Sequence, residues 1–600
     1  MQHSSNNPFS LPLRPPILAG AAEQLLGLKK LTNIYKRCDL QQPPEVFLDS
    51  ALREFNVRVN VDDPREVLKN IPKQGSLLVV ANHPIGGLEG IAIFRELLRH
   101  RPDTKVLTNK LLNGIPELSD VFIGVDILSP QAARDNIAGI RAAKKHLASG
   151  AVLLVFPAGK VATYNREQRR VSEYPWHRFV GSLLRATNAA VLPIYVDARN
   201  SKLFYALSMV HPVLRTAMLP RELANKKRGE LRLVIGDLIS AKEFRHLESD
   251  AQISDCLRLA CELMGTDRDA GKAAIRDDKP LARSASDYAQ EHQLELARQL
   301  VALESCKVIE AAPFAVYIAS YDELGPMMEA IGVAREETFR AAGEGTGKLV
   351  DVDRFDRHYL HVFAWDTQEN RVVGGYRLGR VNEIVAEHGI DGLYARTLYS
   401  LDQSYLEKLG NPLELGRSFV HPDYQRKLSA LDLLWRGIGH YVAARPEFNT
   451  LFGAVSISRE HSDMARALIA ESMLTSFRAE QKYLQDVAPL APLKVSGKIW
   501  SGDTLSSLSH VPLVNKLVGC CDPGKALPIL LRHYLSLNGR FVCFSVNKVF
   551  NDSLDGLILV DMRKVPSRYM KRYLGKRGAV DYEAYWRERE SAGALDALRT

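Results

Sequence analysis

One short stretch constrains this chain more than any other: an apolar run at 77–81 that passes directly into Asn-His-Pro-Ile-Gly-Gly-Leu-Glu-Gly at 82–90. Five consecutive apolar residues predict a buried strand, and the amphipathic pattern over 88–98 predicts a helix. Gly86 and Gly87 allow the chain to turn back between them. The order strand, turn, helix is typical of an α/β sheet.

The same stretch carries two groups with complementary acid–base chemistry. His83 follows the predicted strand end, and Glu89 lies at the start of the predicted helix. A carboxylate beside an imidazole fixes its tautomer and stabilises the imidazolium, so that the imidazole can remove a proton from an alcohol. We therefore predict a catalytic pair. The alternative is an ordinary strand–loop–helix connection with an incidental histidine.

The α/β pattern extends over residues 60–245, where apolar segments alternate with helical periods. The predicted strands are 77–81, 105–108, 121–123, 152–156, 191–196 and 231–235, and the predicted helices are 88–98, 132–147 and 179–187. We expect one α/β domain here. A helical, basic segment at 1–59 precedes it and is suited to lie close to a membrane.

The second half of the chain has a different pattern, which predicts an α+β domain at 290–600. A charged, helix-patterned linker at 246–289 separates the two domains. The predicted strands are 314–319, 360–365, 371–378, 413–420 and 451–455, and a long helix is predicted at 428–443.

Charge and composition narrow the choice of partners. The net charge is +9 with 25% charged residues, which favours an anionic membrane surface or an acidic carrier protein. The sequence has no zinc-spaced Cys/His set, no RNA-binding aromatic signature and no arginine-rich arm, so we expect no metal site and no nucleic acid. No apolar run reaches the ~18 residues of a membrane span, and no signal peptide is visible. We expect a cytoplasmic protein that acts peripherally on the inner face of the bacterial cytoplasmic membrane.

Two further strand ends complete a set with the histidine turn. Phe156-Pro157-Ala158-Gly159-Lys160 closes one strand, and Val191-Leu192-Pro193-Ile194 lies in another. Over 60–245 this order resembles the glycerolipid acyltransferase family. The resemblance implies an O-acyltransferase with catalytic His83 and Glu89. It also implies a substrate site that includes Asn82, Gly86, Gly87, Phe156, Pro157, Gly159, Lys160 and Pro193.

The departures from that family bear on the acceptor. The acid is Glu89, one position later than the family's Asp, and Ala158 and Lys160 replace the family's Glu and Thr. The missing phosphate-binding pattern suggests an acceptor without glycerol phosphate, as in the branch that O-acylates amino-acid-containing lyso-lipids. Lys160 is either a partner for a carboxylate on the acceptor or a solvated turn lysine.

The second half carries a separate set of polar residues in a fixed order: Arg335, Glu344, Asp353, Asp356, Arg377, Glu414 and Arg417. From 290 to 575 this order resembles the GNAT-like N-acyltransferases of ornithine lipids and, more distantly, the acyl-homoserine-lactone synthases. The resemblance implies N-acylation of an amino acid, ornithine above others. Glu414 would bind the amino group and Arg417 the carboxylate, with both expected to be catalytic. Asp353 and Asp356 contact a cationic side chain of the substrate or, alternatively, serve as local cap residues.

The segment 425–430, Gln-Arg-Lys-Leu-Ser-Ala, lacks the glycines with which ordinary GNAT enzymes bind the coenzyme A pyrophosphate. We therefore expect acyl-carrier protein as the donor partner and no bound cofactor. Together the two halves predict a bifunctional enzyme of aminolipid synthesis. The second half N-acylates an amino acid with a 3-hydroxyacyl chain, and the first esterifies that hydroxyl. The alternatives are a single-function lysophospholipid O-acyltransferase with an accessory GNAT domain, or a degenerate membrane- or carrier-binding protein.

Overall fold

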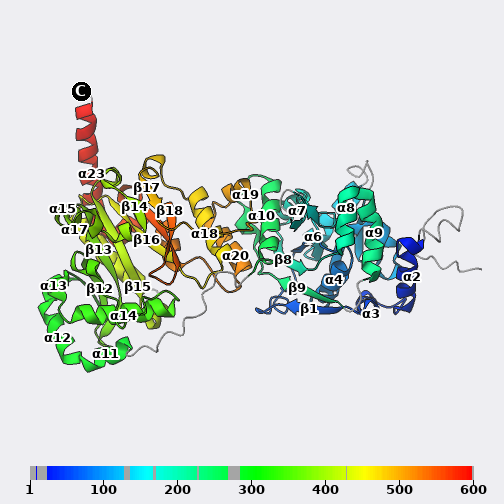
Figure 1. The fold of residues 1–600 in the computed structure, drawn as a ribbon, viewed down its shortest axis with the longest axis horizontal. Helices are drawn as coiled ribbons and strands as arrows, with labels where there is room; N and C mark the ends of the chain where they lie inside the picture. Colours follow the sequence, from blue (N-terminus) through cyan, green and yellow to red (C-terminus); the bar gives the residue numbers. More distant parts are fainter. Residues whose placement is uncertain are drawn as a thin grey trace, which may run out of the picture. The chain divides into compact units, whose positions relative to one another are not determined.

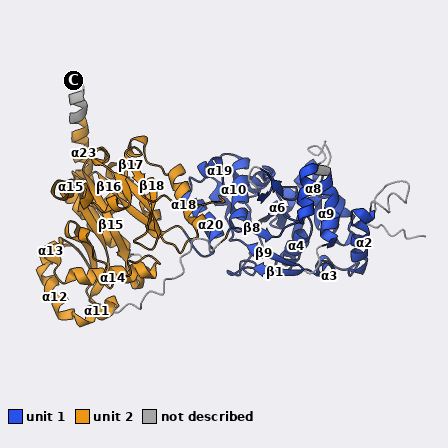
Figure 2. Cartoon of the chain, in the orientation of Figure 1, with its two compact units in different colours: residues 1–266, 499–526 blue, residues 267–498, 527–600 orange. Residues whose placement is uncertain are grey.

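The computed structural model describes residues 9, 23–126, 136–166, 170–225, 229–267, 284–426 and 429–597. The chain forms two compact units, coloured separately in Figure 2. Unit 1 comprises residues 1–266 and 499–526, and unit 2 comprises residues 267–498 and 527–600. Residues 268–283 of the predicted linker lie outside the described residues.

Unit 1 is built on a seven-stranded sheet with the order β1-β9-β8-β2-β5-β3-β4; β1, β8 and β9 of this sheet are labelled in Figure 1. Neighbouring strands are parallel except β8 and β9, which are antiparallel. The strands are β1 (Arg58–Asp62), β2 (Leu77–Ala81), β3 (Thr104–Asn109), β4 (Phe122–Val125), β5 (Val152–Val155), β8 (Ala190–Asp197) and β9 (Glu230–Ile235). The α/β class predicted for this half is confirmed.

Helices cover both faces of this sheet, and every side chain of the central strand β2 is therefore buried. Leu77, Val79 and Ala81 join one core with α2 (Leu28–Arg37), α3 (Pro44–Phe55) and α4 (Leu88–His100). The remaining helices are α6 (Ile137–Ala148), α7 (Phe179–Thr187), α8 (Lys202–Val210), α9 (Pro212–Asn225) and α10 (Asp250–Leu263); a small hairpin joins β6 (Thr163–Asn165) and β7 (Arg170–Ser172). The predicted helix at 132–147 begins at Ile137 among the described residues.

A late segment of the chain, 499–526, belongs to unit 1. Its helices α19 (Gly502–Ser506) and α20 (Val511–Cys521) pack on α10, and Leu513, Val514 and Leu517 of α20 are fully buried. The rings of His246 and His510 lie 4.8 Å apart. These units differ from the division predicted from the sequence, which placed α10 in a linker and 499–526 with the second half.

Unit 2 contains an eight-stranded sheet with the order β10-β11-β12-β13-β15-β16-β19-β18. Its neighbours are antiparallel except β15 and β16, which are parallel. The strands are β10 (Lys307–Ala311), β11 (Phe314–Ala319), β12 (Leu360–Asp366), β13 (Arg371–Arg380), β15 (Pro412–Val420), β16 (Thr450–Ile457), β18 (Arg540–Asn547) and β19 (Ser553–Asp561).

The helices of unit 2 include α12 (Gln293–Ala302), α14 (Met327–Ala341), α17 (Ser429–Ala444), α18 (Asp463–Ser476), α22 (Ser567–Tyr573) and α23 (Gly575–Ala597). The α+β architecture predicted for the second half is confirmed, and α17 is the long helix predicted at 428–443. The sequence analysis assigned no strand to β10, β18 or β19.

Candidate active sites

The histidine turn of unit 1 brings His83 and Glu89 together. His83 follows β2, Glu89 lies in the first turn of α4, and His83 Nδ1 is 3.1 Å from Glu89 Oε1. The Glu89 side chain is completely buried and also accepts hydrogen bonds from the backbone N–H groups of Ile85 (3.0 Å), Gly86 (2.7 Å) and Gly87 (2.8 Å). The turn therefore fixes the carboxylate, and the carboxylate fixes the imidazole.

The electrostatics of this pair suit a base. Burial acts to raise the pKa of Glu89, but the hydrogen bonds from His83 and from the backbone outweigh burial and lower the pKa to about 2. Burial also acts to lower the pKa of His83, and its contact with the Glu89 carboxylate outweighs this, so the pKa is raised. With Nδ1 directed at the carboxylate, Nε2 is the nitrogen left to accept a proton.

A second carboxyl group, which the sequence analysis missed, borders the histidine. Glu173 accepts a hydrogen bond from the backbone N–H of His83 and another from Trp176 Nε1, at 2.7 Å. Burial raises the pKa of Glu173 to about 7. An open hollow of about 400 Å³ lies alongside, lined by the β6–β7 hairpin and by Glu173, Tyr174 and Pro175. No spacing in the sequence connects position 173 with position 83.

The block that follows β5 lies beside the same histidine. The Phe156 ring centroid is 4.7 Å from that of His83, and Pro157 accepts a hydrogen bond from the backbone of His177. Gly159 has φ +61°, and no atom lies within 4 Å of where a Cβ would be. Lys160 is exposed and its Nζ lies 5.6 Å from the centre of the Tyr174 ring.

Asn82 and Pro193 hold the sheet together below this site. Asn82 accepts a hydrogen bond from the Val196 N–H (2.6 Å) and donates one to the Val196 carbonyl (3.0 Å), so it ties the end of β2 to β8. Pro193 is buried within β8, opposite Val80. Both predicted substrate-site residues are engaged with the backbone of the sheet.

In unit 2, the strands β15 and β16 separate halfway along their length. They pair with each other only from Pro412↔Thr450 to Leu415↔Gly453, whereas β15 pairs with β13, and β16 with β19, along almost their whole length. A Cβ on Gly453 would lie 2.0 Å from the Leu415 carbonyl oxygen, so only glycine fits at the last paired position. Beyond it, Arg417 has φ +48° at a bulge of β15. Strands that separate in this way leave backbone N–H groups directed into the opening, where a thioester carbonyl could bind.

The charged residues predicted in this half gather around the opening. Arg335 forms two hydrogen bonds with Asp356 (3.1 and 3.0 Å). Asp353 bridges Arg377 Nη1 (2.7 Å) and Arg417 Nη2 (3.0 Å). The nearby arginines outweigh burial and lower the pKa of Asp356. Asp353 and Asp356 thus form internal ion pairs, and Asp353 also accepts a hydrogen bond from the Phe355 N–H (2.9 Å) as a local cap; their contact with a cationic substrate stays a prediction.

Glu414 and Arg417 are also anchored by protein groups. Glu414 is buried and accepts hydrogen bonds from Tyr359 Oη and from the backbone N–H of Ala395 (2.7 Å). Burial raises the pKa of Glu414. Arg417 donates to Tyr394 Oη (3.1 Å) as well as to Asp353.

A pair of buried carboxyl groups lies on the β16–β19 side. Glu344 accepts a 2.9 Å hydrogen bond from Ser456 Oγ, and Ser456 is the register partner of Asp555. Burial, followed by the nearness of Asp555, raises the pKa of Glu344 to about 8, and burial also raises the pKa of Asp555. Asn547 connects Asp555 (2.8 Å) with Tyr394 Oη (3.2 Å). Asp555 and Ser456 were missed because their meeting depends on strand register.

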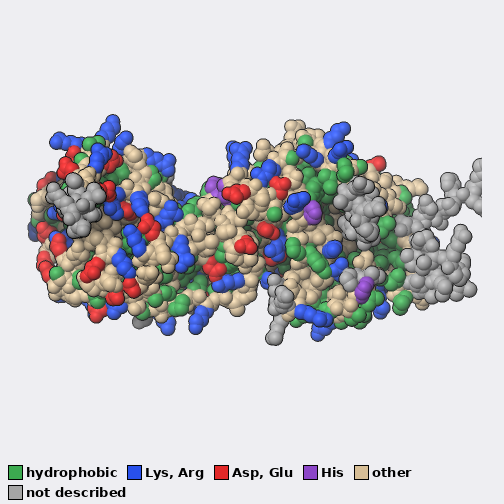
Figure 3. All heavy atoms as spheres, turned by 90° about the horizontal axis from the view of Figure 1, so that it is seen from above, with side chains coloured by type: hydrophobic (Ala, Val, Ile, Leu, Met, Phe, Trp, Pro, Cys, Tyr) green, Lys and Arg blue, Asp and Glu red, His purple; other side chains and the backbone are tan. Residues whose placement is uncertain are grey.

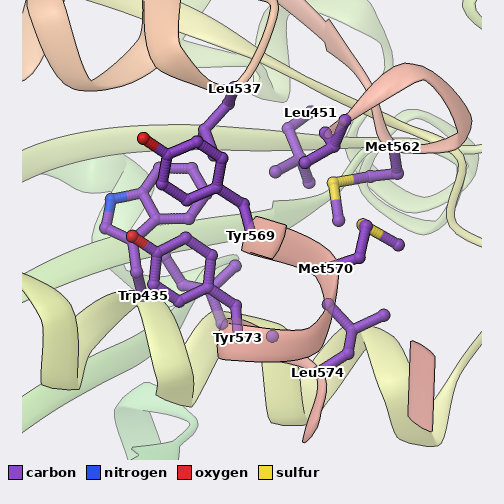
Figure 4. Close-up of a pocket in the computed structure, with 11 residues that line it drawn as sticks. Trp435, Leu451, Leu537, Met562, Tyr569, Met570, Tyr573 and Leu574 are labelled. Atoms are coloured by element: carbon purple, nitrogen blue, oxygen red, sulfur yellow. The ribbon is translucent and has the colours of Figure 1, made fainter. Parts of the chain in front are cut away.

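An apolar pocket elsewhere in unit 2 is not a candidate site. It lies between α17 and α22, and side chains including Trp435, Tyr569 and Tyr573 converge on it (Figure 4). Its free space is about 10 Å³, room for roughly one water molecule and too small for an acyl chain. Among the described residues, no three His, Cys, Asp or Glu side chains are grouped to hold a metal ion. Within the same residues, every helix is too short or too polar to cross a bilayer.

Comparison with known proteins places a family match in each half. Residues 29–260 match the family described as "Acyltransferase", and residues 334–436 match "Acetyltransferase (GNAT) domain". The chain is 28% identical over 268 residues to a glycine N(alpha)-acyltransferase of Phocaeicola vulgatus, which covers 42% of this chain and 80% of the relative. It is 26% identical over 213 residues to a lyso-glycine lipid O-acyltransferase of the same organism, covering 34% and 73%.

A third relative is an L-ornithine N(alpha)-acyltransferase of Rhodobacter capsulatus, 38% identical over 124 residues that cover 19% of this chain and 45% of the relative. The two matches and these relatives show that the chain is an acyltransferase, with an acyltransferase domain followed by a GNAT domain. The expectation of an enzyme that transfers acyl groups is confirmed.

Proposed function

We propose that this chain carries out both acylations that make a two-chain aminolipid. Unit 2 joins a 3-hydroxyacyl chain to the α-amino group of an amino acid, and unit 1 esterifies the hydroxyl of the product. The observation that carries the proposal is that each domain contains its own candidate site: the His83–Glu89 pair and the opening between β15 and β16. Relatives named for each of the two activities support it.

For the N-acyl step, the amine must lose a proton and attack the thioester carbonyl carbon. The C–N bond forms, the C–S bond breaks, and the thiol leaves with the proton. Backbone N–H groups exposed where β15 leaves β16 would bind the carbonyl oxygen. The carboxyl groups of Glu344 and Asp555 are the protein groups best placed to hold a cationic group, because a cation would offset the cost of burying them side by side.

The amino acid is ornithine in this proposal. A diamine supplies a second cationic group for the Glu344–Asp555 pair, whereas glycine supplies none. Glycine remains the second candidate, because two glycine N(alpha)-acyltransferases are among the relatives.

For the O-acyl step, His83 takes the proton of the lyso-lipid hydroxyl, and Glu89 stabilises the imidazolium that forms. The hydroxyl oxygen attacks the donor's thioester carbon, the C–O bond forms, the C–S bond breaks, and the imidazolium gives its proton to the leaving thiolate. The acceptor would approach through the hollow beside Glu173, with exposed Lys160 nearby for a carboxylate.

The donors in this proposal are acyl-carrier-protein thioesters, and no cofactor is needed. An acidic carrier suits a chain with net charge +9. The reaction would take place on the cytoplasmic face of the membrane, where the product accumulates. Residues 427–428 of the glycine-poor segment lie outside the described residues.

The test is lipid extraction and mass spectrometry from cells that express the chain, fed labelled ornithine or labelled glycine in parallel. Diacylated ornithine lipid is the expected product. A glycine lipid instead would replace the amino acid in the proposal and leave the two steps intact. Acylated phospholipid without any aminolipid would favour a single-function O-acyltransferase, and no new lipid would favour a binding protein.

The carboxyl pair is tested separately with purified protein. Glu344→Gln and Asp555→Asn should each raise KM for ornithine at least tenfold, because each removes a carboxyl group that would ionise against the bound cation. The control is Asp561→Asn in the same strand as Asp555, which pairs only with Arg563 among the contacts described. Equal KM values in all variants would exclude the pair as the cation site.

A further inference from the structure

The helical hairpin α8–α9 covers the catalytic turn of unit 1. Its inner side is apolar: Phe204 is fully buried and clusters with Val161 and Met218. The hairpin also touches the turn itself, because a Cβ on Gly86 would lie 2.9 Å from Leu219 of α9 and a Cβ on Gly87 would lie 3.3 Å from Leu223 of the same helix. The position of this hairpin is therefore fixed by the residues next to His83.

The outer side of the hairpin is apolar as well. Residues Lys202, Leu203, Ala206, Met209 and Val210 are exposed and occupy about one third of the circumference of α8. Leu203 is 50% exposed, Val210 74%, Met209 40% and Leu214 of α9 39%. We call these four apolar residues the hairpin face. A helix that faces water carries polar side chains there, so an apolar outer face indicates a contact surface.

The charge of the segment 198–225, which contains the hairpin, is almost entirely positive. From 198 to 225 the sequence has the cations Arg199, Lys202, Arg215 and Arg221, and a single acid, Glu222. Glu222 is buried and accepts hydrogen bonds from Ser201 N (2.9 Å) and Oγ (2.6 Å), so it presents no charge outside. The sequence continues with Lys226-Lys227-Arg228, which lie outside the described residues. Figure 3 shows hydrophobic side chains beside Lys and Arg side chains on unit 1.

We propose that the hairpin face docks unit 1 onto an anionic lipid bilayer. Leu203, Met209, Val210 and Leu214 enter the boundary between headgroups and acyl chains, and Lys202 and Arg215 lie at the level of the anionic headgroups. Apolar area combined with positive charge is what binds a helix in the plane of such a surface. The inference rests on the proposed function, since a lyso-lipid acceptor resides in the bilayer and docking would bring it beside the His83 turn.

The test is co-sedimentation of the full chain with vesicles of phosphatidylglycerol and phosphatidylcholine (1:1) and with vesicles of phosphatidylcholine alone. The parent protein should bind the anionic vesicles and lose most of that binding in 0.5 M NaCl. The double variant Leu203→Asp/Val210→Asp should bind at least tenfold more weakly, because two inserted apolar groups become repelled charges.

The matched control is Leu294→Asp/Val301→Asp on α12, where the side chains are 78% and 77% exposed. It should bind vesicles like the parent. As a further measurement, brominated lipid should quench the fluorescence of the tryptophan introduced by Val210→Trp and not that of the tryptophan introduced by Leu294→Trp. Equal binding by both double variants, or quenching at neither position, would overturn the docking surface.

Binding is measured without turnover, so a failure of the proposed function is seen separately. If neither acylation occurs but the hairpin variants still lose vesicle binding, the docking surface is supported and the proposed function is wrong. If the hairpin variants change only the oligomeric state in size-exclusion chromatography, the occupant is a protein and the proposal is wrong.

Discussion

Glu173 accepts a hydrogen bond from the backbone N–H of His83. His83 therefore contacts two carboxyl groups, that of Glu89 through its imidazole and that of Glu173 through its backbone. Glu173 and Glu89 differ sharply in electrostatics. Hydrogen bonds lower the pKa of Glu89 to about 2, and burial raises the pKa of Glu173 to about 7. One carboxyl is a permanent anion, and the other changes charge near neutral pH.

This difference predicts a pH-dependent effect of Glu173→Gln on stability. Because the folded-state pKa is raised, Glu173 contributes no penalty below about pH 4.5, and folding pays an increasing cost as the pH rises through 7. The variant should therefore raise the free energy of unfolding at pH 8 by up to about 3 kcal/mol and change it little at pH 5. Denaturant unfolding of unit 1 at both pH values is the measurement. A loss of stability at pH 8 would contradict the assignment.

The base assignment predicts a selective loss in His83→Ala. O-acylation should fall about 10²–10⁴-fold, while N-acylation is unchanged, so the mono-acylated lyso-lipid accumulates. Mass spectrometry of extracted lipids detects both species. The control is His100→Ala, at the far end of the same helix α4. Diacylated product at the parental rate in His83→Ala would remove His83 from the mechanism.

The strand separation in unit 2 predicts opposite outcomes at two neighbouring glycine positions. In Gly453→Ala the new Cβ would lie 2.0 Å from the Leu415 carbonyl oxygen, so β15 and β16 must move apart. We expect the free energy of unfolding to fall by about 1–3 kcal/mol or more, and N-acylation activity to be lost as well. In Gly416→Ala the atom nearest to the new Cβ is Arg377 Nε at 4.0 Å, so this variant should keep its stability and its N-acylation activity. Thermal unfolding and an N-acylation assay compare them; equal behaviour would rule out this packing constraint.

The assignment of 499–526 to unit 1 predicts which fragments fold. A fragment of residues 1–266 lacks α20, whose buried residues Leu513, Val514 and Leu517 cover α10 in the full chain. With that face of α10 exposed, the fragment should aggregate or unfold without a cooperative transition. Joining 499–526 to it through a flexible linker should give a soluble unit that O-acylates added lyso-lipid. Calorimetry and the O-acylation assay test both fragments. A stable, active 1–266 fragment would show that α19 and α20 are dispensable.

Much of unit 1 followed from the sequence because its signals are local. The buried run Leu77–Ala81 identifies β2, and only five residues separate His83 from Glu89 across one turn, so the geometry of a single connection brings them together. The charged residues of unit 2 could also be selected in advance, because their order along the chain resembles that of the GNAT-like N-acyltransferases. Their partners could not be selected, and Asp353 and Asp356 pair with arginines of the chain itself.

The sequence alone therefore determined the two fold classes and the His83–Glu89 pair, because strand and helix periods and a tight turn are properties of neighbouring residues. Only the tertiary structure decided that Glu173 meets His83, that Ser456 brings Glu344 to Asp555, and that 499–526 packs on α10. Those contacts join segments about 90 to 250 residues apart, and they depend on sheet register and on which face each helix buries. Neither property is expressed in a local pattern, so no reading of the sequence alone could have placed them.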